Sequence, residues 1–80
     1  MAEEMSRDLC NMCQNLKRLR EKKGYSLLEL SQRTQIQEPI LQRLEAIDVP
    51  DDFDVDELFR ICVCLKVQPS KIFEEPEANG

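Results

Sequence analysis

The chain contains no histidine and has few aromatic residues among its 80 positions. Without an imidazole there is no histidine base, no Cys–His nucleophile pair and no metal site with a histidine ligand. Only two glycines are present, whereas Leu, Glu, Gln, Lys and Arg are common. This composition indicates an all-α fold and removes most hydrolytic chemistry. The sequence therefore predicts a protein that is not an enzyme and that uses no cofactor and no metal.

Long apolar runs are also missing. No stretch approaches the ~20 residues that cross a bilayer, and the N-terminus MAEEMSRDLC lacks the basic-then-apolar order of a secretion signal. Eighty residues with 41% hydrophobic content form one small domain, close to the lower limit for a single core. We therefore expect a cytoplasmic protein that does not contact a membrane, with its cysteines reduced.

Positive charge is scarce as well. The chain carries 11 Lys and Arg against 16 Asp and Glu, which gives a net charge of −5. The only basic stretch is residues 16–24, and the acidic excess concentrates in residues 47–80. This charge pattern therefore predicts no broad electropositive surface of the kind that accompanies tight, nonspecific nucleic-acid binding.

The four cysteines raise the question of redox or metal chemistry. Cys10 and Cys13 form a CxxC on one face of a predicted helix, but the strand-to-helix context of a redox site is absent. Cys62 and Cys64 stand about 200° apart on a helix, so their thiols cannot chelate one ion together. We interpret Cys10, Cys13 and Cys62 as small apolar residues, and Cys64 as similar or partly exposed.

The first half of the chain predicts two helices. Ser6 can act as an N-cap, after which apolar residues recur at helical spacing until Gly24, which predicts a helix over about residues 7–23. Ser26 can cap a second helix, with Glu29 placed to complete a capping box. The inward residues of these helices are expected to be Leu9, Met12, Cys13, Leu16 and Leu19, then Leu27, Leu30 and Ser31.

The second half predicts a turn at residues 34–37 and three further helical segments. Pro39 fits the first turn of a helix over Gln37 to Ala46, where its missing N–H costs nothing. Asp54 caps a fourth helix, and a last turn from Pro69 to Glu74 buries Ile72 and Phe73. The apolar positions of these segments are Ile40, Leu41 and Leu44, followed by Val55, Leu58, Ile61, Cys62 and Leu65.

The order and spacing of these segments resemble the lambda-repressor and Cro type of helix-turn-helix domain. The resemblance runs from Leu16 to Phe73 and is carried by LKRLREKKGYS, LLELSQRTQI, ILQRLE and LFRICVCLKVQPSKIF. It implies a five-helix bundle with an extended first helix. On this basis residues 1–8 form an N-terminal tail, residues 9–74 the helix-turn-helix domain, and residues 75–80 a disordered C-terminal tail.

The resemblance also implies roles for individual residues. The helix at Gln37–Ala46 corresponds to the family's recognition helix, and an arginine–glutamate pair corresponds to Arg20 with Glu45. The residues that match base-contacting positions or face the same way are Gln37, Glu38, Gln42 and Arg43. The candidate phosphate contacts are Lys17, Arg18, Lys22, Lys23 and Arg33. Double-stranded DNA is therefore the expected partner, bound by a homodimer.

Three features depart from the family pattern. Leu27 stands where relatives place a phosphate-binding glutamine, and Gln35 replaces the glycine of the turn, which would then be strained or differently shaped. The loop after the recognition helix carries Asp48, Asp51 and Asp52, where relatives often have basic residues. Each phosphate that is not neutralised loses a counterion-release contribution, so we expect modest, salt-sensitive affinity.

Two interpretations of function remain from the sequence. The first is a sequence-specific transcriptional regulator. The second is a protein-interaction module that keeps the fold and binds another regulator or a toxin through its acidic loop and apolar first helix. Leu9, Met12 and Cys13 either cover the end of the bundle or form a dimer seam that spaces two recognition helices about 34 Å apart.

Overall fold

The protein forms a bundle of helices around one core. The structure, a computed structural model, describes residues 2–75, and the side chains of residues 7–75; the rest of the expected C-terminal tail lies outside these residues. The elements are α1 (Ala2–Lys23), α2 (Leu27–Thr34), α3 (Glu38–Glu45), α4 (Val55–Leu65) and α5 (Pro69–Ile72). Residues 2–75 contain no strand, so the predicted all-α class is confirmed.

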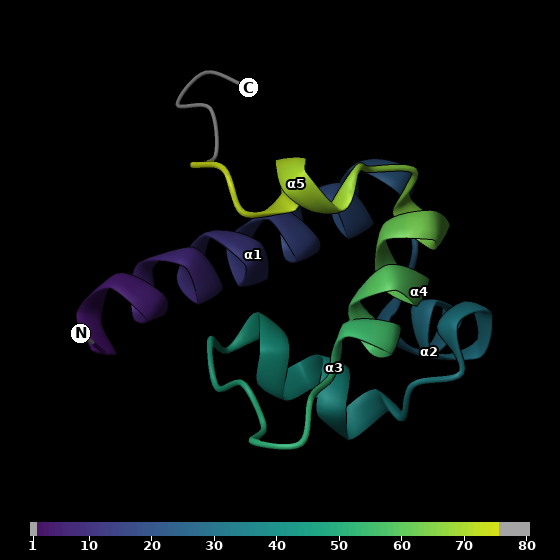
Figure 1. Cartoon of the computed structure of the whole chain (residues 1–80). Coiled ribbons are helices and arrows are strands. Elements are labelled where there is room, and N and C mark those ends of the chain that lie inside the picture. Colours follow the sequence, from purple (N-terminus) through teal and green to yellow (C-terminus); the bar gives the residue numbers. More distant parts are fainter. Residues whose placement is uncertain (1, 76–80) are drawn as a thin grey trace.

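Helices α1 and α4 hold the bundle together. Helix α4 packs against α1, α2 and α5, and α1 also packs against α3 and α5, while α3 packs against α1 and α2. The long α1 crosses the molecule beside α5, and the α3–α4 loop extends at the far edge (Figure 1). Among residues 2–75 no helix is both long enough and apolar enough to span a bilayer.

The predicted N-caps at Ser26 and Asp54 are confirmed, whereas one capping bond and the start of α1 differ from the prediction. The Ser26 side chain accepts the Glu29 N–H at 3.0 Å, and Asp54 forms a complete capping box with Glu57. The expected box at Ser26 is only half formed, because the Glu29 carboxylate pairs with Arg33 at 3.5 Å instead. Helix α1 begins at Ala2, not near residue 7, so Ser6 and the expected boundary at residue 8 fall inside this helix.

Four helices end in a residue with left-handed backbone, and only one of the four is glycine. Gly24 ends α1 with φ 76°, as predicted, and the corresponding angles are 61° at Gln35, 60° at Ile47 and 58° at Lys66. The Gln35 N–H donates to the Ser31 carbonyl at 2.7 Å, which closes the helix in the usual left-handed way. The turn therefore keeps the shape of a left-handed helix end, and the replacement of glycine places the expected strain on Gln35.

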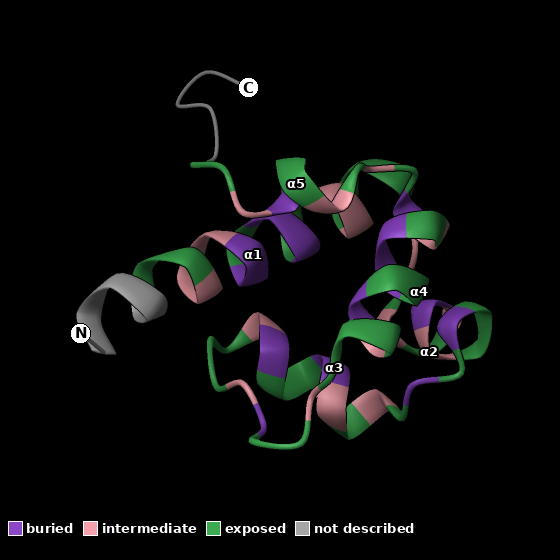
Figure 2. Cartoon of the chain, in the orientation of Figure 1, coloured by how far each residue is buried: buried purple, intermediate pink, exposed green. Residues whose placement is uncertain are grey.

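The core confirms most of the predicted inward positions (Figure 2). The buried apolar residues are Met12, Cys13, Leu16, Leu30, Ile36, Leu41, Leu44, Leu58, Ile61, Cys62, Leu65 and Ile72. The expectation for Val55 is wrong, since its side chain is 64% exposed at the first position of α4. Leu27 is half-buried, and Cys64 is partly exposed as predicted.

Two asparagines on α1 hold the end of the domain in place. The buried Asn15 amide donates to the carbonyls of Ile72 at 2.8 Å and Glu74 at 2.7 Å. Asn11, one turn earlier, donates to the Phe73 carbonyl at 3.2 Å. These bonds satisfy the carbonyl groups left open at the end of α5 and fix it against α1.

Candidate nucleic-acid interface

The angle between α2 and α3 is set by hydrogen bonds from polar side chains to the backbone of the turn. The Thr34 hydroxyl donates to the Leu30 carbonyl at 2.8 Å and accepts from the Ile36 N–H at 3.3 Å. The Ser31 hydroxyl donates to the Ile36 carbonyl. Ile36 itself is only 2% exposed. Because Ile36 anchors the turn in the core and side-chain hydrogen bonds satisfy the N–H and the carbonyl of Ile36, the structure fixes the angle between α2 and α3.

The predicted pair between Arg20 and Glu45 is confirmed. Nε of Arg20 lies 2.5 Å from Oε2 of Glu45, and Nη2 lies 3.0 Å from Oε1. Nη1 of Arg20 also donates to the Tyr25 carbonyl at 2.6 Å. The pair thus joins the end of α1, the corner before α2 and the end of α3, and it raises the pKa of Arg20 through this hydrogen bonding.

Helix α3 presents a polar face to solvent above an anchored apolar face. Leu41 and Leu44 are fully buried beneath it, and Gln42 and Arg43 are exposed. Gln37 is exposed at the N-cap position, where its side chain makes no capping bond, and Glu38 at the first helical position is half-buried. The structure therefore brings the four candidate base contacts onto one helix, with Gln37 and Arg43 unobstructed by the core.

One contact of α3, between Arg43 and Asp48, was not predicted from the sequence. Arg43 forms a two-point ion pair with Asp48, with Nε 3.0 Å from Oδ2 and Nη2 3.3 Å from Oδ1. The hydrogen bond raises the pKa of Arg43 and lowers that of Asp48. The acidic loop is thus in direct contact with α3. The pair could not be predicted from helical spacing, because its partners are five residues apart and α3 ends between them.

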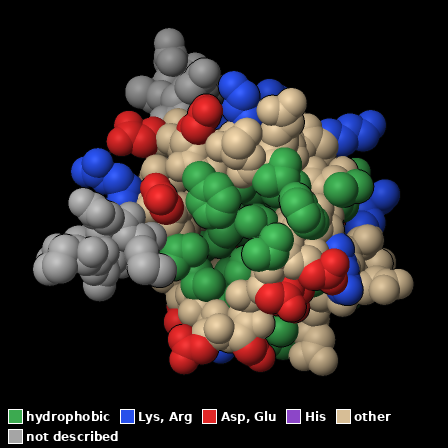
Figure 3. All heavy atoms as spheres, in the orientation of Figure 1, with side chains coloured by type: hydrophobic (Ala, Val, Ile, Leu, Met, Phe, Trp, Pro, Cys, Tyr) green, Lys and Arg blue, Asp and Glu red, His purple; other side chains and the backbone are tan. Residues whose placement is uncertain are grey.

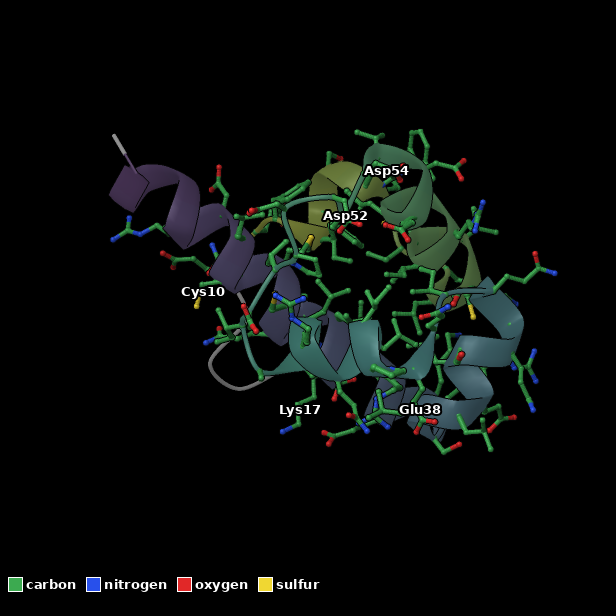
Figure 4. The ribbon with its side chains drawn as sticks, turned by 90° about the horizontal axis from the view of Figure 1, so that it is seen from below. Cys10, Lys17, Glu38, Asp52 and Asp54 are labelled. Atoms are coloured by element: carbon green, nitrogen blue, oxygen red, sulfur yellow. The ribbon has the colours of Figure 1, made fainter. Side chains whose placement is uncertain are left out.

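The candidate phosphate contacts do not lie together on one surface. Lys17 extends from the same side of the molecule as Glu38, whereas Asp52 and Asp54 lie toward the opposite side (Figure 4). Lys22 and Lys23 instead line a hollow with Tyr25. Arg18 is exposed on α1.

A second basic residue group surrounds Tyr25. The Arg33 guanidinium lies over the Tyr25 ring, 4.6 Å from its centre, and also pairs with Glu29. Arg60 and Lys66 line the adjoining hollow, although the sequence reasoning did not single them out. Arg33 is therefore held back on α2 by two partners, which distinguishes it from Lys17.

The three residues considered for a dimer seam are not equally accessible. Met12 is 2% exposed and Cys13 is 0% exposed, since both belong to the core of the single chain. Leu9 is partly exposed. This burial favours the interpretation that the early turns of α1 cover the end of the bundle, and it leaves Leu9 as the accessible member of the three.

Apolar side chains reach the surface on α4 instead. Val55, Phe59 and Val63 follow one another at four-residue spacing and are 64%, 51% and 76% exposed. Residues at this spacing share one helix face. Apolar side chains also gather over the area between α1, α3, α4 and α5, with acidic side chains around them (Figure 3). The domain therefore has uncovered apolar surface away from the buried part of α1.

The thiols of Cys13, Cys62 and Cys64 are less reactive than a free thiol, because burial disfavours their ionised form. Burial raises the pKa of Cys13 to about 11, and the neighbouring Cys10 adds to this effect. Burial also raises the pKa values of Cys62 and Cys64. Reactive cysteines have lowered pKa values. Among the side chains of residues 7–75, no three Cys, Asp or Glu converge as metal ligands.

The comparison with known proteins agrees with this geometry. A family model of helix-turn-helix domains matches residues 15–54, which is half of the 80-residue chain. The match begins in α1, contains all of α2, the turn and α3, and ends at the N-cap of α4. No curated protein sequence matches the chain. The matched segment contains the unit that holds α3 outward, so this protein belongs to the helix-turn-helix domain family.

Proposed function

We propose that this protein is a sequence-specific transcriptional regulator of the lambda-repressor and Cro type that binds double-stranded DNA through α3. The observation that carries the proposal is the exposed polar face of α3, with Gln42 and Arg43 outward and two leucines fixed beneath. In this class of domain the second helix of the motif enters the major groove. Helix-turn-helix domains are typically binding domains without catalytic activity.

Base readout is assigned to the exposed residues of α3. An arginine can donate two hydrogen bonds to O6 and N7 of guanine, and a glutamine can pair in two places with adenine. Arg43 suits the first role, and Gln37 at the start of the helix suits the second. Glu38, at the first position of α3, carries a carboxylate that can accept from a cytosine amino group.

Affinity is expected to be modest and salt-sensitive. Lys17 lies on the side of α3 and supplies a phosphate contact there, with Lys22, Lys23 and Arg18 as further candidates on α1. The loop acids repel the DNA backbone. Each neutralised phosphate adds close to one unit to the slope of log affinity against log salt concentration, so even a few contacts make binding fall as the salt concentration rises.

The protein is proposed to act as a homodimer on a two-fold DNA site, since paired half-sites one helical turn apart are usual for this class. Because Met12 and Cys13 are buried, the seam would use the partly exposed Leu9 or the uncovered apolar side chains elsewhere. Sedimentation equilibrium with and without a selected duplex tests this: a monomer at all concentrations on a single half-site would contradict it.

The DNA-binding proposal is tested by selection and titration. The full chain is incubated at low salt with a randomised duplex library, and the enriched sequence is compared with scrambled DNA by fluorescence polarisation. Arg43→Ala is expected to relax preference at one base pair, whereas Lys17→Ala is expected to weaken binding to all sequences equally and to reduce the salt slope. Absence of any enriched sequence, or equal losses on every sequence for Arg43→Ala, would contradict the proposal.

A second candidate function is that of a protein-interaction module. The observation that favours it is the uncovered Phe59 and Val63 on α4, together with an acidic loop that is unusual for a DNA-binding surface. The sequence suggested binding through the acidic loop and the apolar face of α1, but Met12 and Cys13 on that face are buried, so the apolar part of the binding surface is placed on α4 instead. Two results together would favour the module. The wild-type protein would show no detectable DNA binding in dilute buffer, and a Phe59→Glu variant would stay folded but lose binding to a protein partner.

A further inference from the structure

The ion pair between Arg43 and Asp48 has a geometry that leaves part of the arginine unused. The carboxylate of Asp48 contacts Nε and Nη2, which lie on one side of the guanidinium. Arginine carries five N–H donors in a planar fork, and this pair uses two of them. The donors at the outer end of the fork, on Nη1 and the second position of Nη2, remain outside the pair. That outer end presents two parallel donors, which match the O6 and N7 acceptors on a guanine edge.

The backbone holds Asp48 beside Arg43 independently of the ion pair. The Asp48 N–H donates to the Arg43 carbonyl at 2.8 Å, and the Ile47 N–H donates to the Leu44 carbonyl at 2.9 Å. Together these bonds form the two-bond Schellman closure of a helix end. Ile47 adopts the left-handed conformation that this closure needs, with φ 60°. The carboxylate is therefore attached to the recognition helix by main-chain structure.

The pair is of little use to the fold. The side chains of Arg43 and Asp48 are 51% and 63% exposed, and pairs between exposed groups contribute little to stability. The backbone closure would remain with any residue that has an N–H at position 48. Arg43 is the one arginine of α3. The main effect of its two-point contact with Asp48 is therefore to fix the orientation of its side chain.

We propose that Asp48 is a positioning residue for DNA reading: it holds the Arg43 side chain from the side and so directs the outer end of the guanidinium toward a guanine. This inference rests on the proposed DNA-binding function and adds a specificity-determining residue to it. An arginine is flexible, and fixing it before binding reduces the ordering cost of the correct contact while disfavouring alternative contacts. The negative charge of Asp48 also reduces the attraction of Arg43 to phosphates, which all sequences share.

The opposite role would be competition, in which Asp48 withholds Arg43 from DNA. The two roles predict different results for an Asp48→Asn variant. Loss of positioning lowers the preference for guanine while general affinity rises. Loss of competition raises affinity most for the guanine-containing site, so the preference increases. The geometry favours positioning, because the outer donors stay available while the pair is formed.

The test measures discrimination in the full-length chain. The base pair at which Arg43→Ala loses preference is first identified in the selected duplex. Dissociation constants are then measured for duplexes with and without guanine there, using wild type, Asp48→Asn and Asp51→Asn. Asp51 is exposed in the same loop and acts on Arg43 only through its charge, so its variant is a matched control for the lost carboxylate. Circular dichroism and thermal unfolding verify that all variants are folded.

The wild type is expected to prefer the guanine duplex by roughly 5- to 150-fold, the range of one two-point contact. Asp48→Asn should reduce this ratio by at least about threefold, whereas Asp51→Asn should leave it unchanged, and both should bind all duplexes somewhat more tightly. Equal ratios for the two variants, or a higher ratio for Asp48→Asn, would overturn the positioning role alone. A wild type without any sequence preference would overturn the DNA-binding proposal and this inference with it.

Discussion

Removing one partner of the Arg20–Glu45 pair should be among the most damaging single substitutions in this domain. The two side chains are only 13% and 9% exposed, so the surviving charge would have little access to water. Arg20→Met also removes the bond to the Tyr25 carbonyl at the α1–α2 corner. Breaking a buried pair costs about 3 to 5 kcal/mol, and the residual exposure places this pair near the lower limit, at about 3 kcal/mol.

The consequences follow from the small size of the chain. A domain of 80 residues has an unfolding free energy of about 4 to 12 kcal/mol, since stability scales at roughly 0.05–0.15 kcal/mol per residue, so this loss is a large part of the total. A loss of about 3 kcal/mol lowers the melting temperature by roughly 12 to 24 °C. The loss should appear as unfolding, with no change in base preference of the fraction that remains folded.

A double-mutant cycle separates the pair from other effects. Urea unfolding is followed by circular dichroism for Arg20→Met, Glu45→Leu and the double variant. Because the double variant strands no charge, it should be more stable than the sum of the single losses by about 2 kcal/mol. The exposed pair Arg33–Glu29, with side chains 51% and 43% exposed, is the control and should couple by less than about 0.5 kcal/mol. Equal coupling in the two cycles would refute the burial argument.

Three further outcomes can be measured on the same chain. Ile47→Gly should raise the free energy of unfolding by about 1 kcal/mol in urea titrations, because a β-branched residue at φ 60° is strained; a loss of stability would contradict this. Asn15→Ala should lower it by about 2 kcal/mol and make the chain after α5 sensitive to protease, since two carbonyls lose their donor; unchanged cleavage would count against the clamp. Raising the pH from about 9 toward 11 should lower the free energy of unfolding. The Cys13 thiol has a pKa of 9.0 when unfolded and about 11 when folded, so in this range it releases its proton mainly in the unfolded chain. A wild-type stability that does not change in this pH range, or the same decline in Cys13→Ala, would exclude this cause.

Local signals in the sequence were sufficient for the helices and their order. Ser26, Asp54, Pro39 and Gly24 act within one or two turns of their own position, so capping, missing donors and left-handed backbone could be predicted from neighbouring residues alone. Apolar spacing predicted the inward faces for the same reason. The failures were at the ends of elements: the polar first turns of α1 carry no apolar stripe, and Val55 begins α4 before the helix turns toward the core.

The ion pair between Arg20 and Glu45 was anticipated from the family resemblance and not from spacing, because 25 residues separate its partners. The bonds from Asn11 and Asn15 to the last turn were missed for the same physical reason. A polar residue on a helix reads as exposed unless the partner that satisfies it is known, and that partner lies about 60 residues away.

The sequence by itself determined that the chain is helical, that its second and third helices form a tight corner, and that its charge is unfavourable for nonspecific DNA binding. These properties depend on composition and on neighbours along the chain. Only the tertiary structure decided that Met12 and Cys13 are core residues, that apolar surface lies on α4, and that Asp48 contacts Arg43. Such features depend on which side of each element the rest of the chain covers, and on where a helix ends, and neither is encoded in any single stretch of residues.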